Sequence, residues 1–172
     1  FGAIVGGWHG DAAITFGVGE LSPERQALSD VTLESLLAGI AAARLGGRVG
    51  DVSHAIERSI RSHAHPYGIV AEYTGHGIGS AMHQEPDVPN LGRRGRGPKI
   101  VPGLCLAIEP MVTVGSAETA VLDDEWTVVT RDGSDAAHWE HTITVTRGGV
   151  WVLTAPDGGE ELCARLGVRF GP

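Results

Sequence analysis

The chain has 172 residues, 42% of them hydrophobic, with a mean hydropathy of +0.02, so it is long enough for one globular domain with a substantial core. No apolar run approaches the roughly 20 residues of a membrane-spanning helix, and a net charge of −8 disfavours general nucleic-acid binding. The two cysteines, Cys105 and Cys163, lack CxxC spacing, which excludes a disulfide framework and a zinc finger and fits a reducing, cytoplasmic setting.

Residues 1–17 are typical of a β-hairpin. The strand at 3–5 leads to Gly6-Gly7, a favoured turn pair. The return strand carries Asp11 at its middle, where carboxylates are uncommon; the alternative to a functional role is an Asp on an exposed sheet face. The chain begins at Phe1, inside the first strand, and we therefore expect it to be a fragment of a longer protein with an incomplete first half.

Two helices are predicted next. Ser22-Pro23-Glu24 is a strong helix start, with Ser as N-cap and Pro at the first helical position. Gly46-Gly47 is expected to end this helix, and a second helix is expected from near Asp51 to before Pro66. The two buried stripes at helical spacing are Leu33, Leu36, Leu37 and Ile40, and then Val52, Ile56 and Ile60. Three histidines are interpreted as surface or cap residues: His54, His63 and His65.

The second half is a run of predicted strands. A strand at 67–73 leads into a glycine-rich segment, and a long loop at 84–103 follows, which in a compact domain is usually functional. Its basic residues, Arg93, Arg94, Arg96 and Lys99, are interpreted as solvated. Further strands are expected at 104–114, 126–130, 137–146 and 150–153. The order of elements predicts an α+β fold in a single domain, 1–172, with a tail at 154–172 whose structure stays open.

Four residues suggest a metal site. His76 lies between glycines, which we expect to allow a tight turn and the close approach of a substrate. Asp11, Glu109 and Glu140 lie in apolar segments, where an unpaired carboxylate is costly. One imidazole with several carboxylates suits manganese, iron, cobalt or zinc. Because a cation would neutralise these acids together, we predict a metal-assisted hydrolytic site.

Four motifs carry a family resemblance that covers roughly residues 1–153. They are Trp8-His9-Gly10-Asp11, the Gly75-to-Pro86 run with Met82-His83, Ile108-Glu109-Pro110-Met111-Val112, and Trp139-Glu140-His141-Thr142. In this order they resemble type I methionine aminopeptidases. The resemblance implies a pita-bread fold, a centre of two divalent ions, and removal of the initiator methionine from nascent chains whose second residue is small.

The resemblance also implies residue roles. Asp11 and Glu140 match ligands that bridge the two ions, whereas His76 and Glu109 match ligands of one ion. Glu109 is then the expected proton shuttle, and His83 matches a residue that contacts the substrate carbonyl and stabilises the tetrahedral intermediate. Met82 and Trp126 match positions of the methionine side-chain pocket, although strand packing alone would also explain Trp126. The implied partners are nascent N-termini, with the ribosome as a candidate, and the implied protein is a cytoplasmic monomer.

The sequence departs from the family in two ways. The family's first ligand, another Asp, falls one residue before Phe1, and we therefore expect this fragment to fold poorly, to hold at most one ion tightly and to have little activity. His138 stands where the family often carries Gln. Two alternatives remain, an Xaa-Pro-type aminopeptidase and a non-catalytic pita-bread binding protein. The Met-His-x-x-Pro run argues against the first, and the intact ligand positions argue against the second.

Overall fold

The computed structural model describes residues 1–172. Its helices are α1 (Pro23–Ala42), α2 (Val49–Arg61) and α3 (Glu160–Leu166). Its strands are β1 (Gly2–Val5), β2 (Trp8–Ala13), β3 (Gly68–Ile69), β4 (Gly75–Gly77), β5 (Gln84–Val88), β6 (Leu104–Ile108), β7 (Met111–Thr113), β8 (Thr119–Val121), β9 (Val128–Thr130), β10 (Ala136–His138), β11 (Glu140–Val145) and β12 (Val150–Val152). None of the three helices combines the length and the apolar character of a membrane span.

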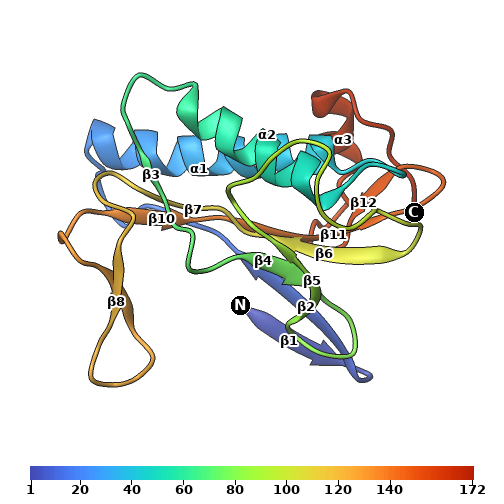
Figure 1. The fold of residues 1–172 in the computed structure, drawn as a ribbon, viewed down its shortest axis with the longest axis horizontal. Helices are drawn as coiled ribbons and strands as arrows, with labels where there is room; N and C mark the ends of the chain where they lie inside the picture. The colour runs from blue at the N-terminus through green and yellow to red at the C-terminus, as the bar shows by residue number, and fades with distance from the viewer.

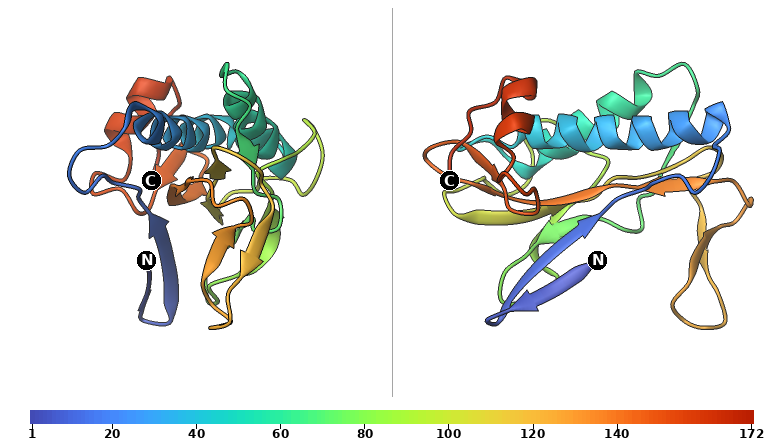
Figure 2. Two further views of the ribbon diagram at one scale, coloured as in Figure 1. Left: turned by 90° about the vertical axis from the view of Figure 1, so that its left-hand side faces the viewer. Right: turned by 180° about the vertical axis from the view of Figure 1, so that it is seen from behind.

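One antiparallel sheet dominates the molecule. Its strand order is β1-β2-β11-β6-β4-β5, and β12 also pairs with β11. A smaller sheet, β10-β7-β3, and the β8–β9 hairpin complete the strands. Helices α1 and α2 lie side by side on one face of the sheets, and α3 lies near one end of the same face (Figure 1). The β1–β2 and β8–β9 hairpins project from the opposite side (Figure 2).

The predicted N-terminal hairpin is confirmed, with Gly6 and Gly7 both at positive φ in its turn. The start of α1 is confirmed too, since the Ser22 hydroxyl accepts a hydrogen bond from the N–H of Arg25 at 3.4 Å. The predicted end is wrong, because α1 ends at Ala42, four residues before Gly46. The backbones of Gly46 and Gly47 instead exchange hydrogen bonds with Ile100, which pairs this connection with the later loop.

The buried faces of the helices meet the large sheet. Leu36 and Ile40 are fully buried as predicted, whereas Leu33 and Leu37 are only partly buried. Small polar residues occupy part of the buried face of α1. One of them is Thr32, whose hydroxyl donates to the carbonyl of Leu28 at 2.7 Å. The main apolar side chains between helices and sheet are Leu36, Ile40, Val52, Ile56, Ile60, Leu106, Ile108, Val112 and Ile143.

Several predicted strands are divided. Residues 104–114 form β6 and β7, which belong to different sheets, and residues 137–146 form β10 and β11, separated by Trp139. Both breaks fall where the chain passes between the large and the small sheet. There the backbone N–H of Trp139 donates to the carbonyl of Pro110. The strand predicted at 67–73 is confined to β3, the strand at 126–130 to β9, and the loop at 84–103 begins with β5. The tail contains α3.

Candidate metal centre

The predicted ligands form a row across the large sheet. The neighbouring strands are β2, β11, β6 and β4; β2, β11 and β4 carry Asp11, Glu140 and His76, and Glu109 directly follows β6. Glu140 pairs with Ala13, and Asp11 lies two residues before Ala13 on the same strand. Residues two apart on a strand point to the same face. Asp11 and Glu140 therefore share one face of the sheet.

Strand β6 places the other two ligands on that face. His76 pairs with the residue two before Glu109, and the register between β6 and β11 puts Glu140 opposite Glu109. Potential ligand atoms of Asp11, His76 and Glu140 all lie within 4.8 Å of one another, as do those of Glu109, His138 and Glu140. The structure thus brings the four predicted ligands together, with Glu140 common to both groups.

His76 is held in one orientation on β4. Its Nδ1 lies 3.0 Å from the carbonyl oxygen of Gly77, and its side chain is almost fully buried. A neutral imidazole that donates from Nδ1 keeps the lone pair of Nε2 free for a cation. Burial alone would lower the pKa of His76, but contacts with the Glu109 carboxylate and the Gly77 carbonyl raise it overall.

The glycines around His76 have a different role from the one expected. A Cβ on Gly75 would lie 2.4 Å from the carbonyl oxygen of Ala107, and a Cβ on Gly77 would lie 2.2 Å from that of Glu85. Neither glycine has a positive φ. Gly75 and Gly77 are therefore required by the close backbones of β6 and β5 on either side of β4.

Glu109 lies at the break between β6 and β7, with its side chain 14% exposed. Its Oε1 lies 3.3 Å from Nε2 of His76, and its Oε2 lies 3.2 Å from Nε2 of His138. Burial alone would raise the pKa of Glu109, but the two imidazoles lower it overall. A buried Asn90 donates its amide N–H to the backbone carbonyl of Glu109 at 3.3 Å, which fixes this turn.

Glu140 is the carboxylate of the row whose charged form is most strongly disfavoured. It is 3% exposed, and its Oε1 has no hydrogen-bond partner. Burial, followed by repulsion from Glu109 and Asp11, raises the pKa of Glu140 to about 8. Three carboxylates that share a buried face are stable as anions only when positive charge compensates them.

The three predicted substrate contacts lie at different places. His83 is exposed, but its ring centroid lies 4.4 Å from that of His76 in an edge-to-face arrangement. Met82 is half-buried, and its side chain packs against Gly2 of β1. A Cβ added to Gly2 would lie only 2.5 Å from the Met82 methyl carbon. Trp126 is 86% exposed in the loop between β8 and β9.

Two supporting residues escaped the sequence analysis. Asn90 lies in the Pro- and Gly-rich loop and has no flanking pattern that marks it. Thr142 accepts the N–H of Asp11 at 3.2 Å and donates to the Asp11 carbonyl at 2.7 Å, which ties β2 to β11. Thr142 was named only as the last residue of the Trp139-to-Thr142 motif, with no role assigned, although it lies two residues after Glu140 and therefore on the same face of the strand.

The Peptidase_M24 model, described as metallopeptidase family M24, matches residues 1–147. The chain belongs to metallopeptidase family M24. The methionine aminopeptidase 1 of Mycobacterium tuberculosis is 58% identical over 157 residues, which cover 89% of this chain and 59% of that relative. The chain thus spans about 60% of the length of the M24 relatives it matches.

Solved M24 structures agree with the observed fold. The methionine aminopeptidase of Thermotoga maritima matches with a TM-score of 0.85 at 43% identity, over 89% of this chain and 61% of that one. The enzyme of Rickettsia prowazekii also gives a TM-score of 0.85, at 37% identity, over 90% of this chain and 62% of that one. The predicted α+β pita-bread fold is therefore confirmed for the part of that fold which the chain spans.

The donor set fits the divalent metal that the M24 family name implies. One imidazole nitrogen and carboxylate oxygens from three strands suit borderline and hard cations. The unpartnered Oε1 of Glu140 is a buried acceptor that such a cation would satisfy. Both observations come from the arrangement of this chain's own side chains.

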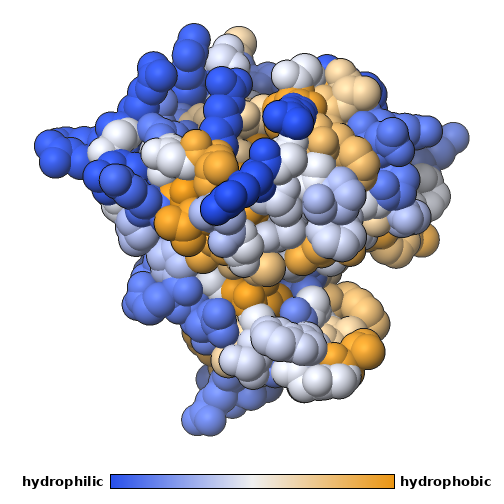
Figure 3. Space-filling model, turned by 90° about the vertical axis from the view of Figure 1, so that its right-hand side faces the viewer, coloured by the Kyte–Doolittle hydropathy of each residue, from blue (hydrophilic) through white to orange (hydrophobic).

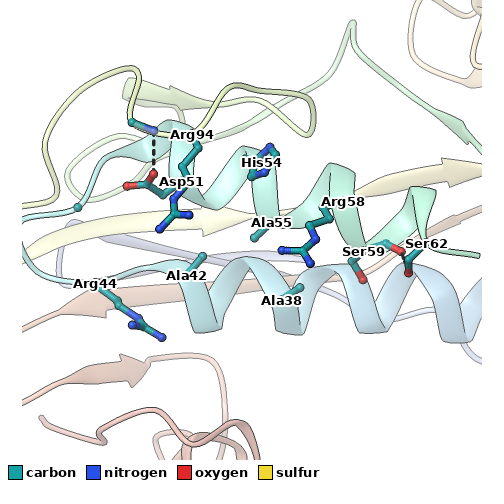
Figure 4. Close-up of a pocket in the computed structure, with 12 residues that line it drawn as sticks. Ala38, Ala42, Arg44, Asp51, His54, Ala55, Arg58, Ser59, Ser62 and Arg94 are labelled. Atoms are coloured by element: carbon teal, nitrogen blue, oxygen red, sulfur yellow. Dashed lines mark hydrogen bonds between the residues drawn. The ribbon is translucent and has the colours of Figure 1, made fainter.

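A second hollow in this M24 chain lies apart from the ligand row. Figure 4 shows a groove of about 760 Å³ between α1 and α2, in which Arg58 and Arg94 flank small alanine side chains. No predicted ligand lines the groove. Asp51 accepts the N–H of Gly95 at 2.8 Å and thereby fixes the arginine-rich loop against α2. His54 also lines this groove, away from the candidate centre.

Proposed function

We propose that the protein removes the initiator methionine from nascent chains whose second residue is small. The observation that carries this proposal is the row of Asp11, Glu140, Glu109 and His76 on one face of the sheet, with an unpartnered Glu140 oxygen within it. Relatives named as methionine aminopeptidases support the specificity, at up to 58% identity. Because the chain spans about 60% of their length, the activity is proposed for the full-length protein.

Asp11, His76, Glu109 and Glu140 would hold the metal centre, with Asp11 and Glu140 shared between two ions. Manganese, iron, cobalt and zinc all match this donor set. When bound, such ions activate water at neutral pH and polarise the scissile carbonyl. The chain's own acids are then compensated, and Glu140 is ionised at neutral pH.

Two side chains carry the proton chemistry in this proposal. Glu109 accepts the proton of the attacking water and delivers it to the leaving amine, because its carboxylate lies between the imidazoles of His76 and His138. His83 donates a hydrogen bond to the developing oxyanion, since its exposed ring lies beside that of His76. Met82 and Trp126 contribute to binding of the methionine side chain.

The cellular setting follows from the substrate. Nascent N-termini are cytoplasmic and emerge at the ribosome, which is a candidate docking partner, and a monomer suffices for the reaction. We further propose that residues 1–172 alone turn over slowly, because the hairpins beside the ligand row leave large apolar side chains exposed. Ile4 is 64% exposed and Trp8 is 66% exposed.

The test is a peptidase assay of the full-length protein, with residues 1–172 beside it. With added Mn²⁺ or Co²⁺, the full-length protein should release methionine from Met-Ala-Ser and should leave an Ala-Pro peptide intact. A chelator should abolish the reaction, and Glu109→Gln should lower both kcat and metal affinity, because Glu109 is a proposed ligand as well as the proposed proton shuttle. Cleavage of Ala-Pro would instead identify an Xaa-Pro-type aminopeptidase. A full-length protein that binds no metal would be a non-catalytic relative.

A further inference from the structure

We infer that His138 is an additional metal ligand, which gives the centre a second imidazole beside His76. The inference rests on the proposed metal centre and extends its ligand set. A ring nitrogen of His138 and one carboxylate oxygen each of Glu109 and Glu140 all lie within 4.8 Å of one another. The ion that binds Glu109 and Glu140 would therefore take His138 as a third protein ligand.

The backbone brings His138 to this position independently of its rotamer. His138 ends β10 and Glu140 begins β11 two residues later, and the pairing of His138 with Met111 and of His141 with Ile108 keeps one register across Trp139. Residues at that spacing point to the same face. Thr15 clamps the His138 backbone, because its hydroxyl accepts the His138 N–H at 3.1 Å and donates to the His138 carbonyl at 2.7 Å.

The contact with Glu109 has the geometry of two ligands around a common ion. Nε2 of His138 and Oε2 of Glu109 are 3.2 Å apart. Two ligand atoms at about 2.0–2.2 Å from one cation lie about 2.8–3.6 Å apart, between octahedral and tetrahedral angles, and 3.2 Å falls within this range. The neighbouring pair, Nε2 of His76 and Oε1 of Glu109, has nearly the same separation of 3.3 Å.

A plain hydrogen bond explains the contact less well. Nε2 of His138 is buried and has no hydrogen-bond partner of acceptable geometry, although a carboxylate oxygen lies so close. The Oε1 atom of Glu140 is unpartnered in the same way. Buried polar atoms without partners are rare and costly. One cation between His138, Glu109 and Glu140 would satisfy both atoms.

The other histidines differ in this respect. Nδ1 of His141 lies 2.8 Å from the hydroxyl of Thr154, and His65 contacts the carbonyl of Val114 at 2.8 Å. His63 lies 3.2 Å from Glu34 at the surface. Each of these imidazoles has a partner outside the ligand row. Besides His76, His138 is the histidine whose ring nitrogen lies close to two carboxylates of the row and has no other partner.

The experiment is proton NMR of the full-length protein loaded with Co²⁺, which shifts the ring protons of a coordinated histidine far outside the normal range. We expect two sets of strongly shifted ring-proton resonances, one from each of two coordinated histidines. His138→Gln should remove one set, His76→Gln should remove the other, and His54→Gln, a control on α2, should change neither. His138→Gln should also weaken Co²⁺ binding about tenfold or more in competition with a chromophoric chelator.

The outcomes separate this inference from the proposed function. A single shifted set that His76→Gln removes and His138→Gln leaves intact would overturn the inference, because His138 would then only orient Glu109. The metal centre itself would stand in that case. A complete absence of shifted resonances, with no binding of Co²⁺, would overturn both the inference and the proposed centre.

Discussion

The two sides of the large sheet have different surroundings. On one side, α1 and α2 bury a continuous core, with Leu36, Ile56 and Ile108 fully inaccessible. On the other side, two hairpins project (Figure 2) and leave apolar residues in solvent, and apolar side chains are visible at the surface in the lower part of the space-filling view (Figure 3). The most exposed of these large side chains are Phe1, Ile4, Val5, Trp8 and Trp126.

The ligand row lies at the boundary between these two regions. His76 and Glu140 are 4% and 3% exposed and belong to strands that the helices cover. Asp11 comes from the projecting β1–β2 hairpin, with its side chain 17% exposed. The helix-covered side therefore sets the geometry of most ligands, whereas the hairpin side supplies one ligand and the approach to the site.

The largest expected effect is on the covered side. Ile108→Ala should lower the free energy of unfolding by about 2–5 kcal/mol, because it removes a fully buried side chain beside Glu109. Val129→Ala on the β8–β9 hairpin should change it by less than about 0.5 kcal/mol, since Val129 is 39% exposed. Urea denaturation of both variants measures the contrast. Equal losses would show that the hairpin belongs to the cooperative core.

The next effect concerns the strand that carries His76. Gly77→Ala should cost about 1–3 kcal/mol, because its Cβ would overlap the backbone carbonyl of Glu85. Gly79→Ala is the matched control, since its Cβ would meet only the mobile amide of Gln84 at 3.3 Å. Thermal unfolding of the two variants tests the difference. A harmless Gly77→Ala would mean that β4 and β5 can separate at low cost.

These glycines show where sequence reasoning succeeded and where it stopped. The four ligands were predictable, because carboxylates and a histidine in apolar, strand-like segments need compensation. The reason for Gly75 and Gly77 was not, since it depends on which strands become their neighbours. The break before Met111 had a signal, because Pro110 lacks the N–H that a continuous strand requires, whereas no residue of 137–146 marks the change of sheet at Trp139.

A pH-dependent effect should appear in the metal-free protein. The pKa of Glu140 is raised from 4.5 to about 8 in the folded state. Between these values the folded state holds a proton that the unfolded state has lost, so stability should fall as the pH rises from about 5 to about 8. Denaturation in chelator across this range measures the slope. Glu140→Gln should flatten it, and an unchanged slope would assign the dependence to other groups.

The smallest effect on stability is expected at Trp126, on the hairpin side. Trp126→Ala should change the free energy of unfolding by less than about 0.5 kcal/mol, because the indole is 86% exposed. If Trp126 contributes to the methionine pocket, the same variant should raise KM for Met-Ala-Ser several-fold with little change in kcat. Trp126→Phe, which keeps an aromatic face, should restore most of that affinity. An unchanged KM would remove Trp126 from the substrate site, and the hairpin side would then contribute through Asp11 and Met82 rather than through β8 and β9.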